Sequence, residues 1–325
     1  MPVIDLQQLR ATFGDRMEEN VPLARFTSAR VGGNADVFLT VESGDELAAA
    51  VGQLWDLQTP FIVLGGGSNL LVSDRGVRGV VINNRAREFR FGETAEPPVV
   101  WAESGANFGL LARQAQSKGL GGLEWAAGIP GTVGGAVVGN AGAHGGKIAG
   151  SLRMAEILHR NLVGQPGIED HEKSPGEYTR EIWSVERFAY NYRTSILKSN
   201  PGEAVVISAV LNLETSTPDQ VRSRMDPLVA HRRKTQPPGA SMGSMFKNPP
   251  DDYAGRLIEA AGLKGVRVGQ AQISPLHANF FINLGGATAG QILNLIHLAQ
   301  DQVEEEFGIT LDLEIELVGE WLGSF

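Results

Sequence analysis

The 325-residue chain contains no cysteine. This absence excludes disulfides, thiolate metal ligands and cysteine nucleophiles, and it is typical of proteins of the reducing cytoplasm. No stretch approaches the roughly 18 uninterrupted apolar residues that a membrane-spanning helix needs. The N-terminal sequence MPVIDLQQLRATFGDRMEEN has no basic segment followed by an apolar run, so it shows no secretory signal. We therefore expect a cytoplasmic protein that does not bind membranes.

Positive charge is also scarce. The chain has 28 lysines and arginines against 37 aspartates and glutamates, which gives a net charge of −9. This balance argues against non-specific binding to nucleic acid or to anionic lipid, and an anionic ligand would need a local basic site. Hydrophobic residues make up 42% and charged residues 20%, as in globular proteins, and the length suits two or three compact units.

Glycine, in contrast, is abundant, with 41 residues. The stretch GGGSN at 65–69 follows a short apolar strand, and its consecutive glycines suit either a phosphate-binding turn or a plain tight turn. The stretch GLGGLEWAAGIPGTVGGAVVGNAGAHGG at 119–146 is too rich in glycine to predict a regular helix or strand. Its spacing matches neither the Rossmann fingerprint nor a P-loop. Two separate glycine-rich turns favour an extended dinucleotide held against the backbone.

Helices and strands alternate along the chain. Ser43 and Glu46 form a capping-box pattern before a helix, and Thr288 and Gln291 form another before a strongly amphipathic one. The polar stretch 161–182 is expected to be an exposed loop or hairpin insertion. We place a domain boundary near 217, before a helix that we expect to kink or break at Pro227.

The stretch LDLEIELV at 311–318 alternates strictly and predicts a strand. Its apolar residues point one way, and its carboxylates, Asp312, Glu314 and Glu316, point the other.

Three polar segments could carry chemistry. In YNYRTS, Arg193 lies between aromatic residues, which suits an oriented guanidinium that binds a carboxylate, although a surface arginine is the commoner alternative. The cluster HRRK at 231–234 is either an anion site or a solvated helix end. The stretch GSMFKNP at 243–249 is either a polar turn or the site of a functional serine, and it lacks the Gly-x-Ser-x-Gly elbow of hydrolases. No histidine spacing indicates a metal site.

Taken in order, TSARVGG, GGGSNLLVSD, the glycine-rich stretch, YNYRTS, GSMFKNP, HANFFIN and LEIELVG resemble the UDP-N-acetylenolpyruvoylglucosamine reductase (MurB) family over nearly the whole chain. The resemblance implies an α+β fold with two FAD-binding subdomains of the vanillyl-alcohol-oxidase-like (PCMH-type) class, at 1–85 and 86–216. A substrate-binding domain would follow at 217–325. The implied reaction is the NADPH-dependent reduction of the enolpyruvyl ether of UDP-N-acetylglucosamine to UDP-N-acetylmuramate, for peptidoglycan synthesis, by a monomer.

The same resemblance assigns roles to single residues. Ser244 corresponds to the proton donor, and Arg193 and Glu314 correspond to the pair that stabilises the enol. The implied substrate contacts are Tyr192, Arg193, Arg232, Lys247, Asn248, His277 and Asn279. The implied FAD contacts are Arg30, Gly65, Gly66, Gly67, Ser68, Asn69, Ser104, Gly128, Ile129, Pro130, Gly131, Thr132, Gly134, Gly135, Asn140, Gly142 and Ala143.

Elementary chemistry agrees with these roles. Hydride addition to an enol ether leaves negative charge delocalised into the neighbouring carboxylate, which a guanidinium fork such as that of Arg193 can stabilise. A positioned serine hydroxyl can then protonate carbon, and Lys247 can ease the loss of its proton. Glu314 helps only if it is protonated or bridges through hydrogen bonds, and crowding by Asp312 and Glu316 favours a raised pKa.

The chain departs from the family at three places. His144 stands where the family usually has tyrosine, and the 161–182 insertion is unusually polar. The connection from 249 to 277 is short, as in the branch that lacks a lid loop. Two alternatives stay open at this stage. One is another FAD-dependent oxidoreductase, such as an alcohol or aldonolactone oxidase with flavin attached to His144. The other is a nucleotide-sugar sensor that has lost the chemistry.

Overall fold

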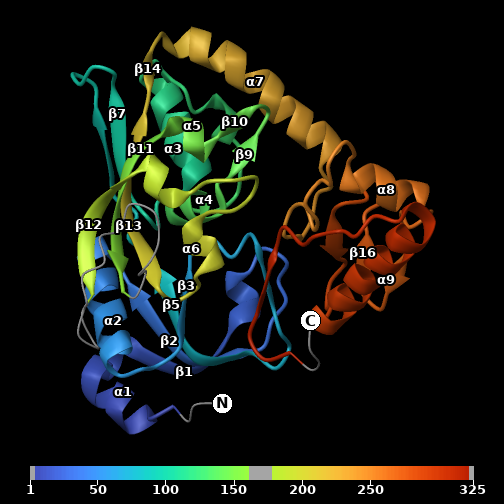
Figure 1. Ribbon diagram of the computed structural model, residues 1–325, viewed down its shortest axis with the longest axis horizontal. Helices are drawn as coiled ribbons and strands as arrows, with labels where there is room; N and C mark the ends of the chain where they lie inside the picture. Colours follow the sequence, from blue (N-terminus) through green and yellow to red (C-terminus); the bar gives the residue numbers. More distant parts are fainter. Residues whose placement is uncertain (1–3, 161–177, 322–325) are drawn as a thin grey trace. The chain divides into compact units, whose positions relative to one another are not determined.

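The computed structural model describes residues 4–160 and 178–321 (Figure 1). The chain divides into two compact units. The first unit comprises residues 1–17, 38–65 and 79–230, and the second comprises 18–37, 66–78 and 231–325. Because each unit is built from separate stretches, residues far apart in sequence come together within it.

The first unit is organised around an antiparallel five-stranded sheet in the order β12-β11-β13-β7-β6. These strands are β6 (Phe89–Gly92), β7 (Val99–Glu103), β11 (Leu152–His159), β12 (Thr179–Ser184) and β13 (Ala204–Asn212). Helices α3 (Phe108–Ser117) and α4 (Val133–Gly139) lie on one side of the sheet (Figure 1). Between them is a core that includes the fully buried Phe108, Trp183 and Phe188.

The other elements that lie wholly or largely in the first unit surround this layer. They are α1 (Leu6–Phe13), α2 (Gly44–Asp56), β3 (Phe61–Leu64), β8 (Leu120–Gly121), β9 (Gly142–Ala143), β10 (Gly146–Lys147), α5 (Ile148–Ser151), α6 (Ile196–Ser199), β14 (Glu214–Thr215) and α7 (Pro218–Thr235). Ser43 caps α2 by accepting from the Glu46 N–H at 3.2 Å, as its sequence pattern predicts.

A four-stranded sheet has the order β1-β2-β5-β3. Its strands are β1 (Met17–Pro22), β2 (Asn34–Val41), β5 (Val77–Asn84) and β3, with β3 and β5 parallel. Along the sequence, β2 and β5 each begin in the second unit and continue in the first.

In the second unit, helix α9 (Ala289–Phe307) packs with the antiparallel strands β15 (Arg267–Val268), β16 (Ala271–Ile273) and β17 (Phe281–Asn283) and with helix α8 (Ala254–Ala260). The predicted capping box of α9 is confirmed: Thr288 and Gln291 each cap the other's backbone N–H. The buried face of α9 is Ala289, Ile292, Leu295, Ile296, Ala299 and Val303.

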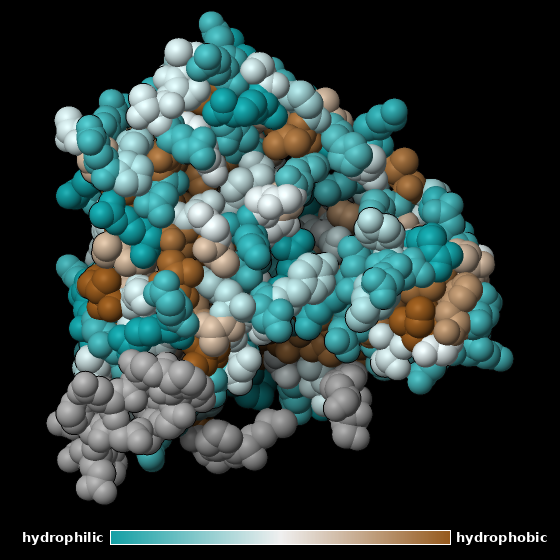
Figure 2. Space-filling model, turned by 45° about the horizontal axis from the view of Figure 1, so that its top comes forward, coloured by the Kyte–Doolittle hydropathy of each residue, from teal (hydrophilic) through white to brown (hydrophobic). Residues whose placement is uncertain are grey.

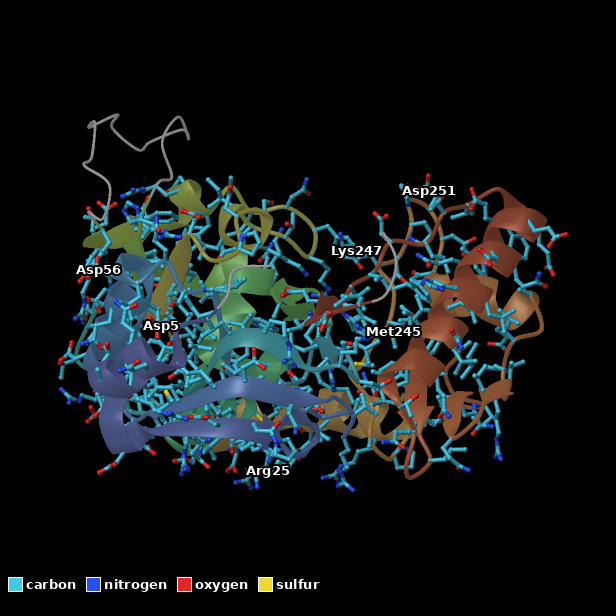
Figure 3. All side chains as sticks on the ribbon, turned by 90° about the horizontal axis from the view of Figure 1, so that it is seen from below. Asp5, Arg25, Asp56, Met245, Lys247 and Asp251 are labelled. Carbon is cyan, nitrogen blue, oxygen red and sulfur yellow. The ribbon has the colours of Figure 1, made fainter. Side chains whose placement is uncertain are left out.

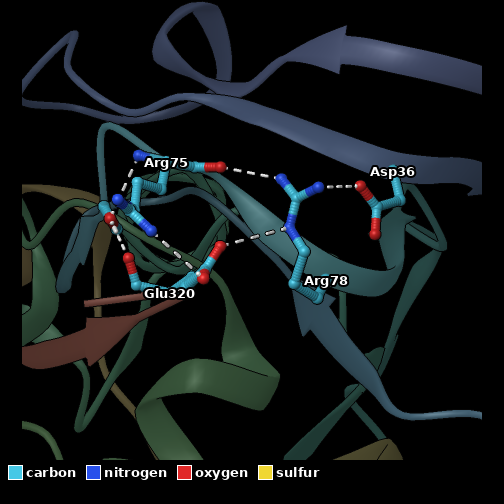
Figure 4. A network of polar contacts seen from close by, with 5 residues as sticks. Asp36, Arg75, Arg78 and Glu320 are labelled. Carbon is cyan, nitrogen blue, oxygen red and sulfur yellow. Dashed lines mark hydrogen bonds and ion pairs between the residues drawn. The ribbon is translucent and has the colours of Figure 1, made fainter. Parts of the chain in front are cut away.

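Strands β4 (Leu70–Val72) and β18 (Glu316–Val318) form a parallel pair in this unit. The segment that directly follows GGGSN therefore lies beside a C-terminal segment. Figure 4 shows the charged network beside it. Arg78 pairs with Asp36 and with Glu320, and Arg75 pairs with Glu320 at 3.3 Å. These ion pairs hold the end of β18 against the chain that follows β4.

Four expectations differ from the structure in whole or in part. The glycine-rich stretch contains helix α4, because Thr132 caps its start and Val133, Ala136 and Val137 pack into the core, so burial overrides poor helix propensity. Helix α7 is expected to kink or break at Pro227, but it is not broken there. It buries only Val221 and Met225, so its carbonyls near the proline are open to water, which can replace the lost hydrogen bond.

The other two expectations concern strands. Of the predicted strand 311–318, only Glu316–Val318 is regular, because the residues before it make a single bridge, from Leu313 to Phe246, and no continuous pairing. The stretch 161–182 is expected to be an exposed loop or a hairpin insertion. Its residues 179–182 belong to β12 and pair antiparallel with β11, whereas 161–177 lie outside the described residues.

On the face shown in Figure 2, apolar residues occur in small groups among polar ones. Within residues 4–160 and 178–321, no helix is both long and apolar enough to cross a bilayer.

Candidate functional site

Two glycine-rich segments meet in the first unit. Gly65 directly follows β3, and a Cβ placed on it would lie 2.5 Å from Thr132 Oγ1. A side chain at 65 is therefore excluded by Thr132, 67 positions later. Thr132 in turn accepts a hydrogen bond from the Gly135 N–H at 3.4 Å.

Ser104, at the end of β7, joins the same cluster. The Gly134 N–H donates to the Ser104 carbonyl at 2.7 Å, and a Cβ on Gly134 would lie 2.8 Å from Ser104 Cβ. The Ser104 hydroxyl is buried and accepts from Asn84 Nδ2 at 2.8 Å. Gly135, by contrast, is exposed, with only Thr132 Oγ1 near its Cβ position, at 3.6 Å. We call these residues (Gly65, Ser104, Thr132, Gly134 and Gly135) the first-unit glycine cluster.

The segment before α4 is fixed by its backbone. The Gly131 carbonyl accepts from the Phe108 N–H at 3.1 Å, and the Ile129 N–H donates to the Ala126 carbonyl at 3.0 Å. Gly128 and Gly131 both have positive φ, 103° and 113°, which glycine adopts without strain. Pro130 between them is exposed.

The opposite end of α4 holds the YNYRTS turn. Tyr190 donates its hydroxyl to the Val137 carbonyl at 2.9 Å, and Ser195 donates to the Val138 carbonyl at 2.6 Å. The buried Asn140 side chain donates to the Asn191 carbonyl at 2.9 Å. Burial raises the pKa of Tyr190 far above its ordinary value, so its hydroxyl stays protonated as a donor.

Arg193 lies in this turn, which the hydrogen bonds above hold to the end of α4. Its φ of 56° places it in the left-handed region, within a turn closed by the Asn191–Thr194 bridge. The guanidinium carbon lies 5.6 Å from the ring centre of Tyr192, which is half exposed. A Cβ on Gly142 would lie 3.3 Å from Arg193 Nη1, so Gly142 leaves room for the guanidinium. Ala143 pairs with Gly146 in the adjacent β9–β10 hairpin.

In the second unit, the remainder of the GGGSN stretch packs against the turn that carries Arg30. The Gly67 carbonyl accepts from the Ser28 N–H at 2.9 Å, and a Cβ on Gly67 would collide with the Phe26 carbonyl oxygen. Arg30 is exposed, with a φ of 56°. Gly66 is exposed, and Ser68 and Asn69 are half-buried.

Ser244 and Glu314 lie on neighbouring extended segments of this unit. Ser244 forms a β-bridge with Phe280, and Phe246 forms one with Leu313. The Glu314 N–H donates to the Met245 carbonyl at 2.9 Å, and the Lys247 N–H donates to the Asp312 carbonyl at 2.8 Å. We call the segments 244–247 and 312–316 the Ser244 ladder. Met245 and Lys247, labelled in Figure 3, lie on its first segment.

Asn69 connects the GGGSN stretch to this ladder. Its side-chain Nδ2 donates to the Glu314 carbonyl at 3.1 Å, and its own carbonyl accepts from the Glu316 N–H at 2.9 Å. The expected phosphate-loop residue thus also holds the backbone of the expected catalytic carboxylate. Sequence patterns give no signal of this contact, because the two residues are 245 positions apart.

Three further candidates of the second unit, Asn279, Asn248 and His277, make different contacts. Asn279 is 3% exposed and bonds the backbone of Phe246 with both ends of its amide. Asn248 is exposed, and its Oδ1 accepts from the Ala254 N–H at 3.1 Å at the start of α8. The His277 ring packs against that of Phe280, with ring centres 4.9 Å apart and the planes tilted by 59°. Burial and the nearby Lys264 lower the pKa of His277, which favours its neutral form.

Arg232 lies in the last turn of α7 and is half-buried, and burial lowers its pKa. Among the described residues, no group of three or more histidine, aspartate or glutamate side chains could hold a metal ion.

The structure therefore brings the candidates together in two sets. The first unit gathers the glycine cluster and the Arg193 turn at opposite ends of α4, and the second gathers Arg30, the 66–69 loop, Ser244, Lys247 and Glu314. Tyr190 and Ser195, which hold the turn to α4, belong to the YNYRTS motif and could be inferred from it. Asn84, which donates to the Ser104 hydroxyl, stands in no motif.

Two family models match separate parts of the chain. The model of the FAD binding domain matches residues 35–159, and the model of the UDP-N-acetylenolpyruvoylglucosamine reductase C-terminal domain matches residues 234–318. The predicted α+β fold is confirmed.

Whole-chain relatives carry the same name. A UDP-N-acetylenolpyruvoylglucosamine reductase from Chloroflexus aurantiacus is 43% identical over 300 residues, covering 91% of this chain and 96% of that protein. One from Rubrobacter xylanophilus is 42% identical over 299 residues, covering 92% and 94%. The crystal structure of the Thermus caldophilus enzyme superposes with a TM-score of 0.73 at 36% identity, covering 93% of this chain and 99% of that one.

Proposed function

Because the chain belongs to the UDP-N-acetylenolpyruvoylglucosamine reductase family, we propose that it reduces the enolpyruvyl ether of UDP-N-acetylglucosamine to UDP-N-acetylmuramate, with FAD as cofactor and NADPH as reductant. The observation that carries this proposal is the Ser244 ladder. It places a serine and a glutamate on segments joined by the hydrogen bond from the Glu314 N–H to the Met245 carbonyl, at 2.9 Å. The product would serve as a peptidoglycan precursor in the cytoplasm.

The residues present fit a flavin dinucleotide. In the first unit, Gly65 and Gly134 have no space for a Cβ, whereas Gly135 leaves its backbone exposed. In the second unit, Gly66 is exposed and Gly67 turns at a φ of 57°. Exposed backbone in tight glycine turns can present N–H groups to phosphate oxygens. Bound FAD would supply the hydride that NADPH provides, and the first-unit glycine cluster would hold it.

Arg193 would bind the carboxylate of the enolpyruvyl group. Its guanidinium offers a planar fork that can bind two carboxylate oxygens, which suits the charge that develops there. The turn that carries it is anchored through Tyr190, Asn140 and Ser195, so the fork needs little reorganisation.

Ser244 would donate the proton to carbon. A hydroxyl is a weak acid, but a carbanion conjugated to a carboxylate is a much stronger base, so proton transfer from a fixed hydroxyl is favourable. Lys247, three residues on, would stabilise the alkoxide that remains, and Glu314 would contribute a hydrogen bond to the enol in its protonated form.

The test separates the two half-reactions. We expect purified protein to show a flavin absorbance spectrum that NADPH bleaches and that the enolpyruvyl sugar nucleotide restores. In Ser244→Ala, NADPH should bleach the flavin at the normal rate, but the substrate should restore its colour at least about 1000-fold more slowly, since general acid catalysis contributes up to ~10⁴-fold. Normal recolouring of this variant would remove the proposed role of Ser244, and colourless protein would remove the proposed reaction.

A further inference from the structure

The side chain and the main-chain carbonyl of Asn279 are bonded to the segment that follows Ser244, whereas its N–H donates to His277 Nδ1 at 3.3 Å. Its Oδ1 accepts from the Phe246 N–H at 2.9 Å, and its Nδ2 donates to the Phe246 carbonyl at 2.8 Å. Its main-chain carbonyl accepts from the Met245 N–H at 2.8 Å. The residue is 3% exposed, so its amide is used inside the protein and not at the surface.

From these contacts we propose that Asn279 is a positioning residue that sets the placement of the Ser244 hydroxyl, instead of the substrate contact that its motif implies. This inference rests on the proposed function, in which Ser244 donates the proton.

The residue immediately before Ser244 adds no side-chain restraint. Gly243 has a φ of 81°, and no heavy atom lies within 4 Å of its Cβ position. Glycine has no side chain that could fix Ser244 through packing on that side. The restraints on Ser244 come from its bridge to Phe280 and from the two residues after it, which Asn279 holds at three points.

A carboxamide is the group that this position requires. The Phe246 backbone presents one donor and one acceptor, and a carboxamide offers an acceptor and a donor in one plane. A carboxylate would keep the acceptor, but it would place an oxygen against the Phe246 carbonyl and leave that carbonyl without its donor.

The same restraint extends to Glu314. The Met245 carbonyl accepts from the Glu314 N–H, and Phe246 bridges to Leu313. Movement of residues 245–246 would therefore displace the serine and the glutamate together. Proton transfer should suffer and reduction of the flavin should not.

The experiment compares Asn279→Asp with wild type in both half-reactions, in protein loaded with FAD. We expect the rate of flavin reduction by NADPH to stay within about twofold. We expect the rate of reoxidation at saturating enolpyruvyl substrate to fall about 10- to 100-fold, because small misplacements of reacting groups cost about that much. The solvent deuterium isotope effect on reoxidation should rise, since proton transfer becomes the slow step.

The matched control is Gln272→Glu, which makes the same change from amide to carboxylate at a side chain that donates to the Gly265 carbonyl at 3.0 Å, away from the Ser244 ladder. Should Asn279→Asp fail to fold, Asn279→Ser is measured in its place. Normal reoxidation in the Asn279 variant, or an equal loss in both half-reactions and in Gln272→Glu, would overturn the positioning role. Ser244→Ala is measured in parallel: if it reoxidises normally, the proposed function fails first.

Discussion

Arg193 is the residue whose chemistry depends most on geometry. Its turn is tied to the end of α4 by three hydrogen bonds from side chains to carbonyls, donated by Tyr190, Ser195 and Asn140. The guanidinium stacks beside Tyr192 at 5.6 Å. Such an arrangement fixes a planar fork, and a lysine ammonium would provide charge without the fork.

Arg193→Lys should therefore slow reoxidation of the flavin by the enolpyruvyl substrate about 100-fold, the loss typical of removing one oxyanion donor. Reduction by NADPH should be unchanged. Stopped-flow absorbance measures both rates, and Arg153→Lys, at an exposed position on β11, serves as the control. Near-normal reoxidation in Arg193→Lys would argue against a carboxylate clamp.

The sequence points to candidates for the proposed chemistry more readily than to the residues that support them. Ser244 and Arg193 stand in short motifs, so they could be proposed from the sequence. The bonds of Asn69 to Glu314, and of Asn279 to Phe246, join segments 245 and 33 positions apart, and no local pattern records them. Supporting contacts of this kind follow only from the tertiary fold.

At the level of elements, the stability of helix α4 depends on the contacts made at its two ends. Its sequence, VGGAVVG, has weak helix propensity, so caps and packing must stabilise it. Ser195 contributes twice: its hydroxyl donates to the Val138 carbonyl at 2.6 Å and accepts from the Lys198 N–H at 3.3 Å at the start of α6.

Ser195→Ala should lower the free energy of unfolding by about 1–3 kcal/mol, because it leaves a partly buried carbonyl and a helix N-terminus without partners. Urea unfolding followed by tryptophan fluorescence measures the change. Ser199→Ala is the control, since that exposed hydroxyl bonds only to the carbonyl one turn earlier, and about 0.5 kcal/mol or less is expected. Equal losses in the two variants would contradict the role of Ser195.

An element that is stabilised by its own residues can be predicted from the sequence, whereas one that is stabilised by distant residues cannot. Helix α9 carries its own capping box and a continuous apolar face, so its start could be read locally at Thr288. Helix α4 and strand β18 could not, because the first is formed by burial of Val133 and Val137, and the second by pairing with β4. The alternating pattern at 311–315 reflects the burial of Leu311 and Ile315, since this segment joins the Ser244 ladder through a single bridge and backbone hydrogen bonds and forms no regular strand.

At the scale of the whole molecule, resistance to acid should depend on a polar network in the first unit. Glu181 accepts hydrogen bonds from Arg187 at 2.8 Å and from Trp183 at 3.1 Å, and it lies 2.6 Å from the buried His159. Chiefly through the bond from Arg187, the network lowers the pKa of the Glu181 carboxyl from 4.5 to about 2. The ionised form is thus favoured more in the folded than in the unfolded chain.

A folded-state pKa below the unfolded value gives stability that is fully present above pH 4.5 and is lost as the pH falls toward about 2. Glu181→Gln should therefore be less stable than wild type at pH 7, and the gap should shrink as the pH falls below 4.5. Urea unfolding followed by tryptophan fluorescence, to which the fully buried Trp183 beside Arg187 contributes, measures both curves. Asp252→Asn in the second unit is the control. Its pKa is also lowered to about 2, by Arg256, but Arg256 is 54% exposed and the two residues lie one helical turn apart, a kind of pair that contributes little at any pH. A gap for Glu181→Gln that stays constant from pH 7 to pH 3 would show that the network stabilises the fold by packing and not by charge.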